Sequence, residues 1–224
     1  DGVQPLPYWI SALLPDEASG MAFRQLLAGS ATYYYAFPTA LSQYDQSTAN
    51  GTGWAPFSDV QQAAVRSVLT YASSVVNLRF TESLTVNRPN TIAFANNSQS
   101  GSAGYASIPG TSSSASDLYL NVADSNSAAP RDGQPGARTL MHEFGHAIGL
   151  RHPFDEPDGA GRAAPPPYLQ GSEDSTKWTQ MSYTSLPIDY HFEYRPLDIA
   201  ALQYLYGPSP TARTGDDVYR LDSE

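Results

Sequence analysis

A short segment in the second half of the chain has the residue types and spacing for metal-dependent hydrolysis. His142 and His146 lie four residues apart, and Glu143 directly follows the first histidine. On a helix, residues four apart share one face, so the two imidazoles can bind one cation at about 2.0–2.1 Å. Glu143 then lies within reach of a metal-bound water. The H-E-x-x-H pattern therefore predicts two zinc ligands and a general base on one turn of helix.

The residues that follow extend this pattern. A bare H-E-x-x-H match also arises by chance, on helices that hold no metal. Here Gly149 follows His146, and a glycine can adopt a positive φ, end the helix and reverse the chain. His152 can then approach the same cation as a third ligand. The full string H-E-x-x-H-x-x-G-x-x-H runs from His142 to His152, and three neutral histidines leave one zinc position open for water.

The complete string resembles the metzincin zinc endopeptidases, and more narrowly the catalytic domain of the serralysins, which are secreted bacterial metalloproteases. Further resemblance lies in Met181-Ser182-Tyr183 and in residues 57–82, 197–207 and 214–219. The resemblance implies a Zn²⁺ cofactor and protein or peptide substrates, with secretion to the extracellular space. It does not extend to the Pro-rich residues 153–177, whose role the sequence leaves open.

Site roles follow from the resemblance residue by residue. It implies that His142, His146 and His152 bind zinc, and that Glu143 moves the proton from the attacking water to the leaving amine. It also implies that Met181 packs beneath the metal. Tyr183 is expected either to ligate zinc or to swing away and stabilise the oxyanion, and a plain core or surface tyrosine is the alternative.

The substrate strand is the least certain part of the site. In proteins of this kind an extended peptide binds against an edge strand, which points to Tyr105, Ala106 and Ser107 as substrate-binding residues. An ordinary internal strand explains the same residues equally well. Replacing Ala106 by proline is expected to raise KM if the strand binds substrate.

Helices and strands are expected in an order that can support this site. Ser58 and Gln61 have the spacing of a capping box, and apolar residues then recur on one face of a helix as far as Val76. Further helices are predicted at residues 138–150, ended by Gly149, and at 196–206. Strands are predicted at residues 32–37, 78–81, 91–95, 105–108 and 117–122. The first 20 residues and residues 151–175 are expected to be irregular.

These elements predict an α+β fold: a metzincin-like catalytic domain with a twisted mixed sheet and two long helices. We expect one domain over residues 1–224, with the cleft between an N-terminal subdomain of about 1–149 and a smaller C-terminal subdomain of about 150–224. Serralysins continue into a calcium-binding repeat domain. No G-G-x-G-x-D repeat occurs here, so Ca²⁺ is expected only if such a domain follows in a longer protein.

Composition excludes several other functions. With 22 acidic against 12 basic residues the net charge is −10, which disfavours binding to nucleic acid phosphates. The sequence has no run of about 18 apolar residues, so no membrane-spanning helix is predicted. The absence of cysteine excludes disulfides and thiol nucleophiles. No signal peptide is visible, so secretion depends on the resemblance alone.

Two other functions stay open beside the endopeptidase. The chain could be a metal-binding, non-catalytic module for adhesion or partner binding, or a zinc hydrolase for a non-peptide amide or ester. The presence of Glu143 beside all three ligands favours an enzyme. We expect a monomer, and a proteinaceous inhibitor is a further candidate partner. His191 is expected to be a surface or packing residue, and Asp216 and Asp217 are expected to be solvated charges.

Overall fold

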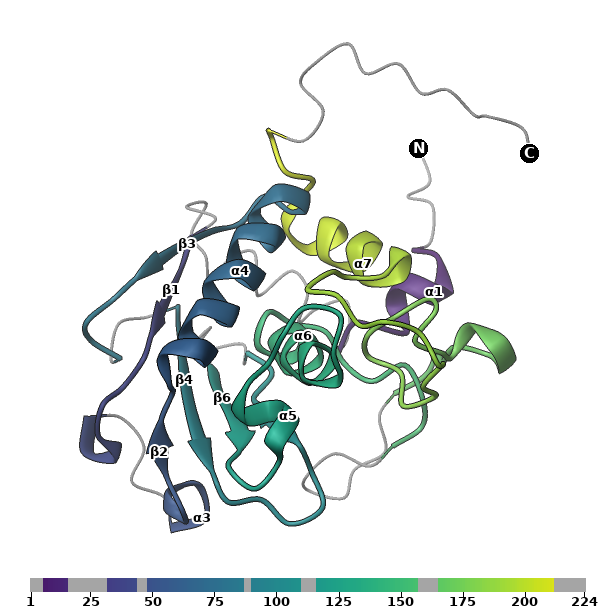
Figure 1. Cartoon of the computed structure of the whole chain (residues 1–224). Helices are drawn as coiled ribbons and strands as arrows, with labels where there is room; N and C mark the ends of the chain where they lie inside the picture. Colours follow the sequence, from purple (N-terminus) through teal and green to yellow (C-terminus); the bar gives the residue numbers. More distant parts are fainter. Residues whose placement is uncertain are drawn as a thin grey trace.

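The computed structural model describes residues 6–15, 32–43, 48–86, 90–109, 116–156 and 165–211. It contains a mixed β-sheet with helices packed against it (Figure 1), which confirms the predicted α+β class. The stretch 214–219, with Asp216 and Asp217, lies outside the described residues.

The sheet is built around two buried parallel strands. Its strands are β1 (Thr32–Ala36), β2 (Ala55–Pro56), β3 (Arg79–Glu82), β4 (Thr91–Asn97), β5 (Gly104–Ala106) and β6 (Ser116–Asn121). The order is β3-β1-β4-β6-β5, and β2 pairs with β4. The β3–β1, β1–β4 and β4–β6 pairs are parallel, whereas β2 and β5 run antiparallel to their neighbours. All five predicted strands are present, and β5 ends the described sheet.

The first long helix, α4 (Asp59–Val75), has the predicted N-terminus. Ser58 Oγ accepts the backbone N–H of Gln61, and Gln61 Oε1 accepts the backbone N–H of Ser58. This reciprocal pair satisfies two backbone donors that a helix start would leave free. Val65, Val68 and Leu69 are buried on one face. In Figure 1, α4 lies across the sheet, and these three side chains belong to the hydrophobic core.

The helix that carries the histidines, α6 (Pro135–Ala147), begins and ends three residues before the predicted bounds. Pro135 fits the first turn because the backbone N–H that proline lacks would have no partner there. α6 contacts β5 and β6 as well as the one-turn helix α5 (Ser125–Ala128). The last helix, α7 (Pro196–Tyr206), has the predicted bounds.

The N-terminal stretch, expected to be irregular or partly ordered, is ordered over residues 8–14. Tyr8–Ser11 form the short helix α1, which contacts α7, and Ala12, Leu13 and Leu14 are buried. Burial of these apolar side chains stabilises the stretch, and Pro7 and Pro15 flank α1 without interrupting it. The remaining short elements are α3 (Thr48–Gly51) and the 3₁₀ turns Leu41–Gln43 and Gly171–Glu173.

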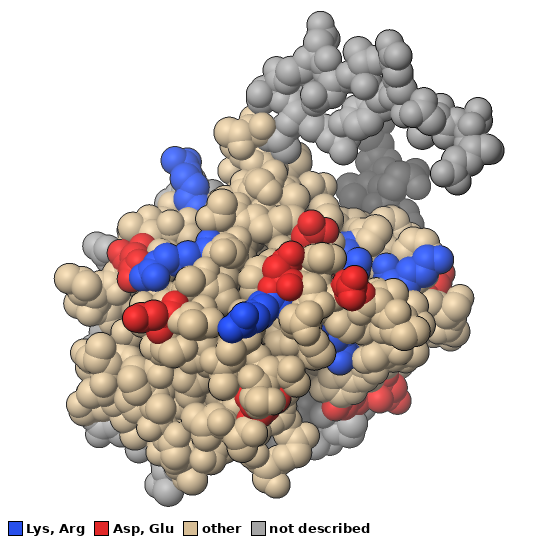
Figure 2. All heavy atoms as spheres, in the orientation of Figure 1, with Lys and Arg blue, Asp and Glu red and all other residues tan. Residues whose placement is uncertain are grey.

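Charged side chains of both signs lie on one face of the molecule. On the face shown in Figure 2, basic and acidic side chains alternate in one band, with no large patch of either sign. None of the helices in the described ranges is both long enough and apolar enough to span a bilayer.

Candidate metal centre

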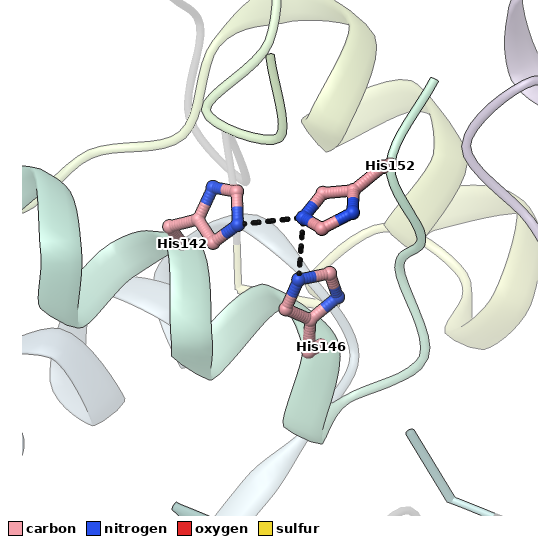
Figure 3. A group of neighbouring side chains, drawn as sticks. All are labelled: His142, His146 and His152. Atoms are coloured by element: carbon pink, nitrogen blue, oxygen red, sulfur yellow. Dashed lines mark hydrogen bonds between the residues drawn. The ribbon is translucent and has the colours of Figure 1, made fainter. Parts of the chain in front are cut away.

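Three histidines converge at the C-terminal half of α6. His142 and His146 project from successive turns of the helix, and His152 reaches the same point from the segment that follows (Figure 3). The Nε2 atom of His152 lies 3.0 Å from Nε2 of His142 and 3.1 Å from Nε2 of His146. Among the described residues, these three side chains form the only group of at least three histidines or carboxylates that could hold a metal ion.

Gly149 makes this convergence geometrically feasible. Its φ is +111°, a region in which side chains are strained. The backbone N–H of Leu150 donates back to the carbonyl of Gly145 over 2.9 Å, and that of Gly149 donates to His146. The chain therefore leaves the helix in a tight reversal, as the sequence predicts for this glycine.

The outward nitrogens of the three rings show which atoms remain for a metal. His142 Nδ1 lies 2.8 Å from the carbonyl oxygen of Gln180, and His146 Nδ1 lies 2.8 Å from that of Leu150. His152 Nδ1 lies 2.6 Å from Oε2 of Glu156. Carbonyl and carboxylate oxygens only accept, so each Nδ1 carries the hydrogen of a neutral ring. Each Nε2 therefore presents a lone pair.

Three lone pairs that point at one another repel, and a cation bound between the nitrogens joined by dashed lines in Figure 3 would relieve that repulsion. In a tetrahedral zinc site with Zn–N distances of about 2.0–2.1 Å, the ligand nitrogens are about 3.3 Å apart. The observed spacing lies close to that value. The donor set thus fits Zn²⁺, and the oxygens that contact each Nδ1 hold each ring in the tautomer that zinc needs.

Electrostatics keep the rings neutral. Burial is the main cause that lowers the pKa of all three, to about 4 for His146 and about 3 for His152, and well below the usual value for His142. The neighbouring histidines lower the pKa of His142 and His152 further. Protons therefore do not compete with a metal at neutral pH.

Glu143 is buried beside the histidines and faces strand β5. Burial raises its pKa to about 8, and the backbone N–H of Ala106, which donates to the carboxylate, acts in the opposite direction. A cation held by the histidines also favours the ionised form. Gly104 lets the strand come this close, because a Cβ atom there would lie 2.9 Å from Cγ of Glu143. The sequence reading did not single out Gly104.

The predicted substrate strand is only partly at the site. Ala106 contacts Glu143, but the backbone N–H of Ser107 donates to Asp117 of the neighbouring strand. The side chain of Tyr105 points elsewhere, with its hydroxyl donating to Asn50 over 2.5 Å. Of the three predicted residues, Ala106 is therefore brought to the reacting centre, and Tyr105 and Ser107 lie one residue away along the strand.

Met181 and Tyr183 lie on two sides of the histidines. Met181 is fully buried against α6, where Gly145 makes room for it: a Cβ atom on Gly145 would lie 2.7 Å from Met181 Sδ. The Tyr183 ring, 56% exposed, stacks on His142 with centroids 5.8 Å apart and also contacts His152 and Phe154. Partial burial raises the pKa of Tyr183 to about 12, so its hydroxyl stays a donor.

Two carboxylates that the sequence reading missed support the site. Glu156 holds His152, and its position four residues after that ligand is the only signal that could have found it. Asp198, fully buried in α7, accepts hydrogen bonds from Thr179 Oγ1 and from the backbone N–H groups of Gln180 and Arg195. Asp198 thereby holds the backbone of Gln180, the residue whose carbonyl oxygen lies beside His142 Nδ1.

His191 takes no part in the centre. Its Nδ1 lies 2.9 Å from Asp132 Oδ2, an exposed pair that joins the segment before α6 to residues 189–193. This agrees with the expected surface role.

Comparison with known proteins finds several serralysins. Serralysin B from Dickeya chrysanthemi is 34% identical over 192 residues, which cover 79% of this chain and 40% of that protein. A serralysin from Proteus mirabilis is 34% identical over 191 residues, covering 75% and 38%, respectively. A serralysin from Photorhabdus sp. (strain Az29) is 30% identical over 207 residues, covering 87% and 42%. The chain thus spans about two fifths of the length of these relatives.

Among solved structures, high choriolytic enzyme 1, a hatching enzyme zinc-protease from Oryzias latipes, is similar with a TM-score of 0.44 and 15% identity. The match covers 78% of this chain and 88% of that one. No protein-family profile matches the chain.

Proposed function

Because this chain belongs to the serralysin family of metzincin zinc endopeptidases, we propose that it hydrolyses peptide bonds in proteins, with zinc held by His142, His146 and His152. The observation that carries the proposal is the convergence of three Nε2 lone pairs beside a buried carboxylate. Extracellular action after secretion is part of the proposal, and its support is the likeness to the serralysins.

Zn²⁺ bound at this site would supply Lewis acidity toward the scissile carbonyl and lower the pKa of a water molecule. Glu143 takes a proton from the attacking water on its carboxylate and delivers that proton to the leaving amine. The Ala106 N–H and the close approach at Gly104 hold this carboxylate in place. The Tyr183 hydroxyl, protonated at neutral pH, can donate to the oxygen that gains negative charge.

The chain's own residues also position the substrate. Ala103 and Ser107, which flank β5, form backbone hydrogen bonds with β6, and Tyr105 between them is in register with Tyr119. Alternation along an antiparallel pair then turns the backbone groups of Gly104 and Ala106 to the outer edge. Because these backbone groups face away from β6, we infer that an extended peptide pairs with this edge by β-augmentation. The outward-facing groups are what favours this reading over an ordinary internal strand.

The proposal is tested by replacing Glu143 with alanine. The variant should keep one zinc ion per chain, since all three ligands remain, and should lose about 10²–10⁴-fold in the rate of casein hydrolysis. Metal content is measured by elemental analysis, and the exposed carboxylate variant Glu82→Gln is the matched control, expected to retain the wild-type rate.

The outcomes separate the three candidate functions. Wild-type hydrolysis that a chelator abolishes and micromolar zinc restores supports the endopeptidase. Zinc binding without hydrolysis of any protein substrate would leave the metal-binding module. Hydrolysis of esters or simple amides alone would assign the non-peptide hydrolase. Normal cleavage by Glu143→Ala would refute the role given to the carboxylate.

A further inference from the structure

A cavity of about 270 Å³ opens directly beside Glu143. His142 and Glu143 form one wall, the segment from Gly101 to Gly104 forms another, and Arg138 and Thr139 close it along α6. Arg138 and Thr139 lie one helical turn before His142 and Glu143, so each shares a helix face with the residue that follows it by four. The cavity is therefore continuous with the reacting centre.

Arg138 is the cationic group of this cavity. Its Nη2 donates to the carbonyl of Ser182 over 3.0 Å, and the guanidinium carbon lies 5.6 Å from the centroid of the Tyr190 ring. These contacts hold the guanidinium in place but do not neutralise it. Within the described ranges no carboxylate forms an ion pair with Arg138, and its Nε is buried with no hydrogen-bond partner.

A fixed guanidinium that has no acidic partner of its own favours a carboxylate over other side chains. Arginine presents its N–H groups in a planar fork that matches a carboxylate, and charge-assisted hydrogen bonds of this kind are about twice as strong as neutral ones. Glu143 is the one acidic side chain in the cavity wall. A cation held by the histidines would offset the charge of Glu143. Arg138 therefore determines which substrate side chain the cavity prefers.

The direction of the strand indicates which substrate residue enters the cavity. β5 runs from Gly104, at the cavity, to Ala106, at the Glu143 carboxylate. A peptide that pairs antiparallel with this edge runs the opposite way, and antiparallel pairs are the commoner kind. Residues on the carboxyl side of the scissile bond then lie over the cavity.

We propose that Arg138 is a specificity-determining residue that selects peptides with glutamate or aspartate directly after the scissile bond. This proposal rests on the endopeptidase function and names the substrate side chain that the same site prefers. The best comparison is glutamate with glutamine, because the two side chains have the same shape and differ in charge.

The test uses the zinc-loaded protein and peptides identical except for glutamate or glutamine after the scissile bond. Wild-type kcat/KM should be about tenfold or more higher for the glutamate peptide, the effect of one charge-assisted hydrogen-bonded contact. Arg138→Gln should bring this ratio close to one, and Arg138→Lys should retain part of it. Arg66→Gln, which removes a distant exposed arginine, should leave the ratio unchanged.

A reversed-charge variant guards against a loss that merely reflects misfolding. Arg138→Glu should cleave a peptide with lysine after the scissile bond in preference to the glutamate peptide. Equal cleavage of the glutamate and glutamine peptides by the wild type, or a preference that persists in Arg138→Gln, would overturn the proposal. A preference for an acid before the scissile bond would overturn the assigned direction.

A binding measurement separates this proposal from the proposed function. Zinc-loaded Glu143→Ala retains the cavity, so fluorescence anisotropy of labelled peptides reports selection without turnover. Tighter binding of the glutamate peptide, lost on adding Arg138→Gln, supports the role of Arg138 even if the wild type cleaves nothing. Equal binding of both peptides refutes that role even if the wild type is an active protease.

Discussion

The metal centre lies between two regions that are built differently. On one side α6 presents His142, Glu143 and His146 from a regular helix, which is buried among apolar side chains and against β5 and β6. On the other side residues 176–195 contain no helix or strand and are held by individual polar contacts, three of which go to Asp198. The helix places its groups by periodicity, whereas the loop places Gln180, Met181 and Tyr183 through individual hydrogen bonds.

This difference teaches where each half is fragile. A periodic helix distributes its stability over many contacts, so most single substitutions remove little of it. In the loop, one buried carboxylate satisfies three donors, so the loss of a single side chain removes three contacts at once. Substitutions at Asp198, at the contact between α6 and the loop, and at the exposed His191–Asp132 pair should therefore have effects of different size.

The largest effect is expected from Asp198→Ala, which removes the anchor of the loop. The buried donors on Thr179 and Gln180 and the partly buried N–H of Arg195 lose their acceptor, so the free energy of unfolding should fall by about 2–4 kcal/mol. Zinc affinity should fall as well, because the Gln180 carbonyl that orients His142 is released. Urea unfolding and competition with a fluorescent chelator measure the two effects.

The matched control is Asp189→Ala, an exposed carboxylate in the same loop, which should change stability by less than about 0.5 kcal/mol. Equal effects of the two substitutions would show that the loop does not depend on Asp198.

A smaller effect is expected at the contact between α6 and the loop, from Gly145→Ala. The added Cβ would lie 2.7 Å from Met181 Sδ, so α6 and the loop must move apart, at a cost of about 1–3 kcal/mol. Thermal unfolding measures this cost. If the contact with Met181 is the cause, adding Met181→Ala should give a total loss smaller than the sum of the two single losses. Strict additivity would place the strain elsewhere.

The smallest effect is expected where His191 and Asp132 pair in solvent. Asp132 raises the pKa of His191, and His191 lowers the pKa of Asp132. The histidine's contribution is therefore present below its unfolded pKa of about 6.5 and is lost as pH rises through the raised value. The aspartate's contribution is present above its unfolded pKa of about 3.9 and is lost as pH falls through the lowered value.

The pair should thus stabilise the fold most between about pH 4 and 6.5. The melting temperature of His191→Gln is expected to fall slightly below wild type at pH 5.5 and to match it at pH 9. A difference that grows at alkaline pH would contradict this assignment.

The same division explains what could be predicted from the sequence. The convergence of the three histidines, the reversal at Gly149 and the capping box at Ser58 depend on short local patterns, and the structure shows all three. The Ser58 cap is a contact between residues three apart. Local physics alone determines such features.

Long-range contacts were beyond the sequence reading. Asp198 meets Gln180 across 18 residues and Arg138 meets Ser182 across 44, and no local pattern marks either pair. The helix α1 was missed because its stability comes from packing against α7 rather than from its own four residues. The start of α6 was missed because Pro135 reads as a loop residue unless its place in a first turn is considered.

The three rings of the centre are also anchored in two chemically different ways. His142 and His146 are held by main-chain oxygens, which every residue type supplies, whereas His152 is held by the side chain of Glu156. A substitution at position 150 or 180 therefore keeps the main-chain oxygen, whereas a substitution at position 156 can remove the carboxylate. The ease with which the ion leaves is thus open to evolutionary adjustment at position 156, without the loss of any ligand.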